Sequence, residues 1–164
     1  MRGLMHHLDL TVQDVGRSAP FYEAVLGFLG YRRVRDDATG LDWDLALPHG
    51  LCGIGIKPAR RERAHDRYTS GLHHFAWNAD SRADVDGLYA VLLGIDATIL
   101  DPPAEYPHYG AGYYAVFFAD PDGLKFELVH YTGGTWQSKP FHEGGTAWND
   151  LKSAPPNRAG SRSS

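Results

Sequence analysis

The sequence lacks several features that would each indicate a particular class of protein. Its 164 residues include one cysteine, Cys52, which excludes an internal disulfide framework and favours a reducing compartment such as the cytoplasm. No apolar run approaches the roughly 20 residues that cross a bilayer, and the first ten residues contain no apolar core of a secretory signal. The formal net charge of −4 gives no excess of positive charge, so neither nucleic acid nor a membrane is expected as a partner.

The two halves of the chain repeat one order of elements. Residues 6–12 alternate apolar and polar side chains, which is typical of a strand, and a helical pattern follows over 15–31. Three short strands are then expected, at 31–35, 42–47 and 51–56. The second half predicts a strand at 72–78, a capping box opening a helix at 81–84, and strands near 98–100, 113–119 and 124–131. The sequence therefore predicts an α+β domain of two βαβββ modules.

This domain is expected over residues 1–131. Module one covers about 5–58 and module two 72–131, and the charged linker 59–71 joins them. Residues 132–164 are rich in Gly, Ser and Pro and are expected to form a C-terminal extension that is a free tail, although three aromatic residues leave partial docking open.

Strand alternation assigns the polar side chains to one face of each module. A helix buries its apolar stripe against a sheet, so the more apolar face of each first strand must face the helix. His7 and His74 then lie on the opposite face, at equivalent places of the two modules. In the last strand Glu127 falls on that same face. If the two sheets curve toward each other, they would enclose a cleft that includes the side chains of His7, Asp9, Thr11, His74 and Asn78.

Two imidazoles and one carboxylate in a cleft form a ligand set for a divalent metal ion. Three protein ligands leave positions open for water and substrate, as in catalytic sites. A single strand histidine is more often structural than a ligand. The repetition of a histidine at the same place of both modules, with Glu127 facing them, favours the metal site.

The chain resembles the vicinal oxygen chelate superfamily, which includes glyoxalases, bleomycin-resistance proteins and dioxygenases. The resembling segments are HHLDLTVQDV with SAPFYEAVLGF, then GLHHFAW, then FFADPDGLKFELV, and the resemblance covers residues 5–131. It implies a curved, half-open mixed β-barrel with the helices outside. It also implies a homodimer, in which each cleft is sometimes built from modules of two chains.

The resemblance implies metal ligands at His7, His74 and Glu127. The fourth ligand position of the family falls at Ile54 when the two modules are aligned on their last turns, which departs from glyoxalase I and from methylmalonyl-CoA epimerase. Two histidines and one carboxylate match the count in extradiol dioxygenases and fosfomycin thiol transferases. The expected cofactor is a divalent ion, and Zn, Fe, Mn, Ni and Co all fit.

The implied function is that of a metal-dependent enzyme of glyoxalase type, a lyase or isomerase that chelates two vicinal oxygens of a small oxygenated metabolite. One alternative is an extradiol-type ring-cleaving dioxygenase using Fe(II). Another is a metal-free binding protein of the bleomycin-resistance type, against which the intact ligand residues argue.

Residues 102–114 are rich in Pro, Gly and Tyr and are expected to form a loop over the cleft mouth. The expected catalytic residues are Glu127, His108 and Tyr109. His108 and Tyr109 would be acids or bases supplied by that loop. The competing interpretation is that the loop aromatics pack at the rim of the barrel.

Overall fold

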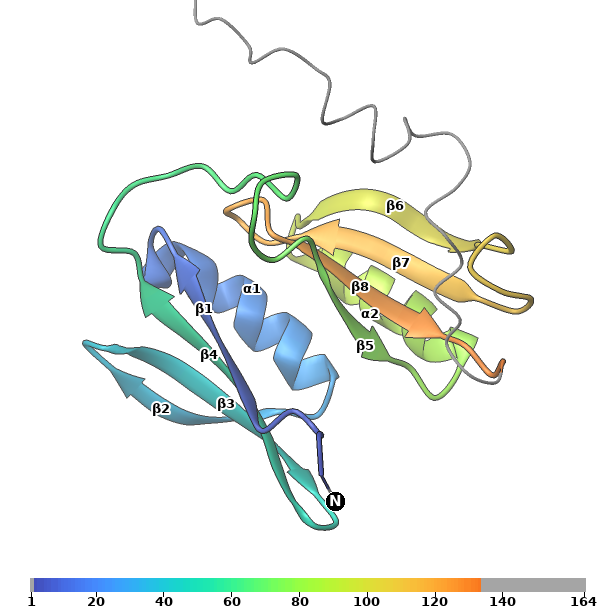
Figure 1. Ribbon diagram of the computed structural model, residues 1–164, viewed down its shortest axis with the longest axis horizontal. Coiled ribbons are helices and arrows are strands. Elements are labelled where there is room, and N and C mark those ends of the chain that lie inside the picture. Colours follow the sequence, from blue (N-terminus) through green and yellow to red (C-terminus); the bar gives the residue numbers. More distant parts are fainter. Residues whose placement is uncertain (1, 134–164) are drawn as a thin grey trace, which may run out of the picture. The chain divides into compact units, whose positions relative to one another are not determined.

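The first module is a four-stranded sheet with one helix on one of its faces (Figure 1). The computed structural model describes residues 2–133, so the expected extension lies outside the described residues except for 132 and 133. The strand order is β1-β4-β3-β2, with β1 parallel to β4 and the other pairs antiparallel. Its elements are β1 (His7–Val12), α1 (Val15–Phe28), β2 (Arg32–Asp37), β3 (Gly40–Leu47) and β4 (Gly50–Pro58).

The second module has the same topology. Its strand order is β5-β8-β7-β6, again with one parallel pair, β5 with β8. Its elements are β5 (Phe75–Asn78), α2 (Arg82–Gly94), β6 (Thr98–Glu105), β7 (Tyr114–Ala119) and β8 (Lys125–His130). The predicted α+β class with two βαβββ modules is therefore confirmed. Within residues 2–133 the strands form two separate four-stranded sheets and not a closed barrel.

Local signals in the sequence fix where both helices begin. The Asp14 side chain caps α1 by accepting a hydrogen bond from the Arg17 backbone N–H at 3.0 Å. The predicted capping box of α2 is present, because Ser81 and Asp84 each accept a hydrogen bond from the other's backbone N–H. Neither helix of the described residues is long and apolar enough to span a membrane.

The two modules share one hydrophobic core. Phe21 of α1 packs against Phe118 and Phe126 of the second sheet, with ring centroids 6.1 and 6.2 Å apart. Beside them, the buried Tyr22 hydroxyl donates to Asp120 Oδ2 at 2.8 Å. Burial of this aromatic surface supplies the main favourable free energy that holds the halves together.

Two predicted element bounds differ in the second module. The strand expected from residue 72 begins only at Phe75, so His74 lies just before β5. The loop expected over 102–114 is wrong at its start, because β6 continues through Pro102 and Pro103 to Glu105. Proline donates no ladder hydrogen bond and is tolerated on an edge strand such as β6, whose register also shifts between Asp101 and Ala104.

Candidate functional site

Each sheet has one face covered by its helix and one face that no helix of residues 2–133 covers, which we call its open face. Alternation places Leu10, Val12 and Trp77 in the core, as predicted, and leaves His7 and His74 exposed on the open faces. The open face of the second sheet is largely apolar. Its buried cluster consists of Tyr113, Ala115, Phe117 and Val129.

Glu127 is the buried carboxylate on this apolar face. It lies on β8 with 2% of its surface exposed. Burial raises the pKa of Glu127, opposed by a hydrogen bond from Tyr113 and by the charge of Lys125. The Tyr113 hydroxyl donates to Glu127 Oε1, and burial raises the pKa of Tyr113 as well. One carboxylate oxygen is thus held in place while the other is left for a further partner.

His74 is the side chain that faces the second oxygen. Its Nε2 lies 3.6 Å from Glu127 Oε2, which is too long for a hydrogen bond. Burial lowers the pKa of His74, and the charge of His73 lowers it further, so a neutral imidazole is favoured. A neutral imidazole beside a carboxylate is the form in which both groups bind a metal ion.

Neighbouring histidines orient both predicted imidazole ligands. His73 Nδ1 lies 2.7 Å from His74 Nδ1, and His6 Nδ1 lies 3.0 Å from His7 Nδ1 in the first module. In each pair the contact engages Nδ1 of the predicted ligand and leaves its Nε2 free. Sequence reasoning gave His6 and His73 no role, although the duplicated His-His pair was the available signal.

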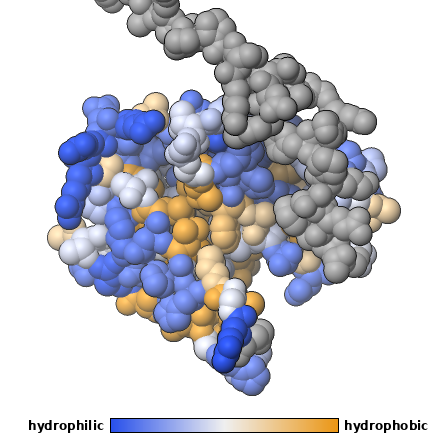
Figure 2. All heavy atoms as spheres, viewed as in Figure 1, coloured by the Kyte–Doolittle hydropathy of each residue, from blue (hydrophilic) through white to orange (hydrophobic). Residues whose placement is uncertain are grey.

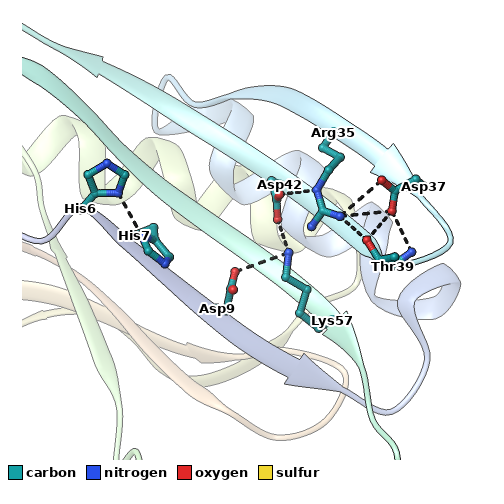
Figure 3. A network of polar contacts seen from close by, with 8 residues as sticks. All are labelled: His6, His7, Asp9, Arg35, Asp37, Thr39, Asp42 and Lys57. Atoms are coloured by element: carbon teal, nitrogen blue, oxygen red, sulfur yellow. Dashed lines mark hydrogen bonds and ion pairs between the residues drawn. The ribbon is translucent and has the colours of Figure 1, made fainter.

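Only two of the three predicted ligands come together in this chain. His7 lies on β1 in the first sheet, and its side chain contacts that of His6 (Figure 3). Among residues 2–133, no group of three or more His, Cys, Asp or Glu side chains is placed to hold a metal ion. The proposed third ligand is therefore not beside His74 and Glu127 within the described part of the chain.

The position equivalent to Glu127 in the first module is a glycine. In the parallel pairs, Ala76 lies opposite Glu127 and Asp9 lies opposite Gly55. The alignment that placed Ile54 there is wrong by one residue, because Ile54 is 1% exposed and faces the core. Gly55, the residue that does occupy the position, also lacks a side chain that could bind a metal ion.

Charged side chains cover the glycines on the open face of the first sheet. Lys57 Nζ lies 2.6 Å from Asp42 Oδ1 and 3.6 Å from Asp9 Oδ1, and Arg35 Nε lies 2.5 Å from Asp42 Oδ2 (Figure 3). The Arg35 guanidinium and then Lys57 lower the pKa of Asp42 to about 2. Hydrophilic residues accordingly dominate this region of the surface in Figure 2.

A cavity of about 440 Å³ lies beside the free edge of β1. Two of the predicted cleft residues, Asp9 and Thr11, line it together with linker residues such as Arg63 and His65. His74 and Glu127 do not line it. This cavity thus joins Asp9 and Thr11 but not His7, His74 or Asn78 of the predicted cleft.

The predicted catalytic residues of the loop lie near Tyr113. The Tyr109 ring centroid is 5.1 Å from that of Tyr113, and the His108 ring centroid is 4.1 Å from that of Tyr109. Burial and the charge of Glu127 raise the pKa of Tyr109, which is half exposed. In residues 2–133 the hydroxyl that contacts Glu127 belongs to Tyr113, and the catalytic roles of His108 and Tyr109 stay predictions.

Two βαβββ modules with an imidazole and a carboxylate on one open sheet face define a class of α+β proteins, and comparisons with known proteins identify it. The model of the Glyoxalase/Bleomycin resistance protein/Dioxygenase superfamily matches residues 4–128. The YqjT protein of Bacillus subtilis (strain 168) is 33% identical over 125 residues, which cover 76% of this chain and 97% of that protein. This chain belongs to the glyoxalase/bleomycin-resistance/dioxygenase superfamily.

Solved structures share the fold. A candidate glyoxalase from Bacillus halodurans is 28% identical with a TM-score of 0.66, and the match covers 79% of this chain and 97% of that one. The lactoylglutathione lyase from Agrobacterium tumefaciens is 19% identical with a TM-score of 0.55, over 79% of this chain and 94% of that one. At that identity the second likeness concerns the fold alone.

Proposed function

We propose that this protein is a metal-dependent enzyme of glyoxalase type, a lyase or isomerase acting on a small oxygenated metabolite. The observation that carries the proposal is the separation of 3.6 Å between His74 Nε2 and Glu127 Oε2. A tetrahedral ion with ordinary bond lengths would separate two such ligand atoms by about 3.4 Å. The pair therefore fits a divalent ion with little rearrangement.

The residues around the pair prepare it for this role. Tyr113 holds one oxygen of Glu127 and so directs the other toward His74. Phe117 and Val129 exclude water from the carboxylate, which strengthens electrostatic interactions there. A bound divalent ion would supply Lewis-acid polarisation of two vicinal substrate oxygens.

We further propose that the protein is a homodimer and that His7 of a second copy completes each ligand set. His7 lies on an open face whose polar residues include Asp9, Asp42 and Asp44. The family resemblance implies dimers in which modules of two chains build one cleft, and a contact between the open faces of two copies is the arrangement that would do so. Such a contact would bring His7 toward the His74–Glu127 pair.

Metal analysis of the purified protein tests the site. The wild type is expected to retain a divalent ion, and His74→Ala and Glu127→Gln are expected to lose it, because each removes one ligand. His65→Ala, an exposed linker histidine, is the control and should retain the ion. A wild type without metal that is indifferent to EDTA would instead support a binding protein of the bleomycin-resistance type. Oxygen uptake with catechols after anaerobic Fe(II) loading would support a dioxygenase.

Mixing two variants that each lack one ligand tests whether two chains share each metal site. His7→Ala and Glu127→Gln chains are refolded together, so that a mixed dimer has one site with both defects and one intact site. Random pairing should then restore about a quarter of the wild-type metal content. If all three ligands came from one chain, the mixture would hold no more metal than the separate variants.

A further inference from the structure

Lys125 shares the open face of the second sheet with Glu127. The two residues are two apart on β8, so their side chains leave the strand on the same side. Lys125 Nζ lies 4.1 Å from the ring centroid of Phe117, and Phe117 is the residue directly opposite Glu127 on β7. The ammonium group is therefore held on an aromatic ring next to the proposed metal ligands.

This ammonium group has no ion-pair partner within 4.0 Å among residues 2–133. The carboxylates of Glu127 and Asp101 act on it only from farther away. By contrast, Lys57 on the first sheet contacts both Asp42 and Asp9. Of these two lysines on the open faces, Lys57 is neutralised by contacting carboxylates and Lys125 is not.

Arg67 adds a second positive charge on the same side of the module. Its guanidinium lies 5.0 Å from the Tyr68 ring centroid, and the Tyr68 ring lies 5.9 Å from that of His73, the neighbour of His74. Arg67 also makes no ion pair within 4.0 Å among the described residues. Burial lowers the pKa of His73 and of His74, and the charges of Lys125 and Arg67 lower both further, so the two cations act on the same pair of histidines.

We propose that Lys125, assisted by Arg67, binds an anionic group of the substrate beside the His74–Glu127 pair. The substrate class is then a small metabolite that carries a carboxylate or phosphate in addition to the two oxygens that chelate the metal. This inference rests on the proposed function for the identity of the neighbouring site. The physical basis is that an anion between two unneutralised cations gains charge-assisted hydrogen bonds and relieves their mutual repulsion.

Matched hydroxy acids test the anion site by calorimetry on the protein loaded with Mn²⁺. Glycerate supplies the chelating oxygens alone, malate adds a carboxylate, and 3-phosphoglycerate adds a phosphate. The wild type is expected to bind malate or 3-phosphoglycerate at least about tenfold more tightly than glycerate. Whichever of these two acids binds more tightly identifies the preferred anionic group as a carboxylate or a phosphate. Equal affinity for all three acids would overturn the proposal.

Variants assign the preference to the lysine. Lys125→Met is expected to abolish the preference while it still binds Mn²⁺, Lys125→Arg should keep most of it, and Lys57→Met should keep it fully. A preference that persists in Lys125→Met would overturn the proposal. So would conversion of a wild-type dimer to a monomer by Lys125→Met, because the ammonium group would then belong to the contact between copies.

A second arm separates this proposal from the proposed function. Inorganic phosphate is titrated into metal-free wild type and metal-free Lys125→Met, with binding followed by phosphorus NMR. Weaker phosphate binding by the variant supports the anion site even if the wild type binds no Mn²⁺, in which case the proposed function alone fails. Equal phosphate binding by the two proteins, in the absence of Mn²⁺ binding, overturns the anion site as well.

Discussion

Glu127 is a buried carboxylate whose two oxygens face different groups. Oε1 accepts a hydrogen bond from Tyr113, and Oε2 faces His74 at 3.6 Å. Burial of a charged group without strong compensation costs free energy, so this residue is a poor choice for stability alone. Its position is explained better by a function that needs a partly desolvated carboxylate, and two predictions follow from that position.

The first concerns the hydroxyl that orients the carboxylate. Tyr113→Phe removes the donor to Glu127 Oε1 while leaving the aromatic ring in place. We expect metal affinity to fall by about ten- to a hundredfold, because a hydrogen bond to a charged group contributes about 1.5–3 kcal/mol. Equilibrium dialysis with a divalent ion measures the change. Tyr109→Phe is the control, and a loss of equal size there would argue against a specific role for Tyr113.

The second concerns pH in the metal-free protein. Burial raises the pKa of Glu127 above 4.5, so the folded state favours the protonated form. The stability contribution of this group is present below its unfolded pKa and is lost as the pH rises through its folded pKa. Glu127→Gln should therefore stabilise the protein by on the order of 1 kcal/mol at about pH 7 and by less at about pH 4. Urea unfolding at both pH values tests this, and a gain of the same size at both would contradict it.

At the scale of elements, β4 is unusual because glycine alternates with isoleucine at its centre. Ile54 and Ile56 face the core, whereas Gly53 and Gly55 lie on the open face. The space above Gly55 is filled by side chains from the two flanking strands, since a Cβ there would meet carboxylate oxygens of Asp9 and Asp42. Glycine on this strand therefore permits the charged network of the first sheet.

Gly55→Ala is expected to destabilise the protein by about 1–3 kcal/mol, because both carboxylates and Lys57 must move to admit the methyl group. Gly27→Ala is the matched control in α1, where a Cβ would meet nothing within 4 Å. That substitution should stabilise by about 0.5 kcal/mol through helix propensity. Urea midpoints measure both, and a neutral Gly55→Ala would show that the network is not closely packed.

At the scale of the whole molecule, the two modules depend on each other. The core cluster combines residues of both sheets and both helices, and Tyr22 of α1 is hydrogen-bonded to Asp120 of the second module. We also propose that residues 132–164 are an extension to the family domain. The family match ends at residue 128, and 76% of this chain covers 97% of the Bacillus subtilis relative.

Neither module is expected to fold alone. A fragment of residues 1–70 would expose Phe21 and the rest of the α1 face that packs on the second sheet. We expect it to lack the near-ultraviolet circular dichroism of a packed core, and to regain it on mixing with residues 71–164. A cooperative thermal transition of the isolated fragment would contradict this expectation.

Much of this fold was predictable because its signals are local. Alternation placed His7, His74 and Glu127 on the open faces, and the capping box located the start of α2. The bounds of β6 were missed because two prolines obscure an edge strand. That Lys125 lies over Phe117 without a contacting carboxylate depends on packing between strands, which no local pattern predicts.

The sequence alone determined which side chains leave each strand on the same face, because that property has a period of two residues and needs no knowledge of the neighbours. Only the tertiary structure decided which of these side chains meet. Strand pairing put Gly55, and not Ile54, at the place of Glu127, and it brought Tyr113 to that carboxylate. Within residues 2–133, the packing of the modules did not bring His7 into one ligand group with His74 and Glu127. Such distances depend on contacts between residues remote in the chain, which no local pattern records.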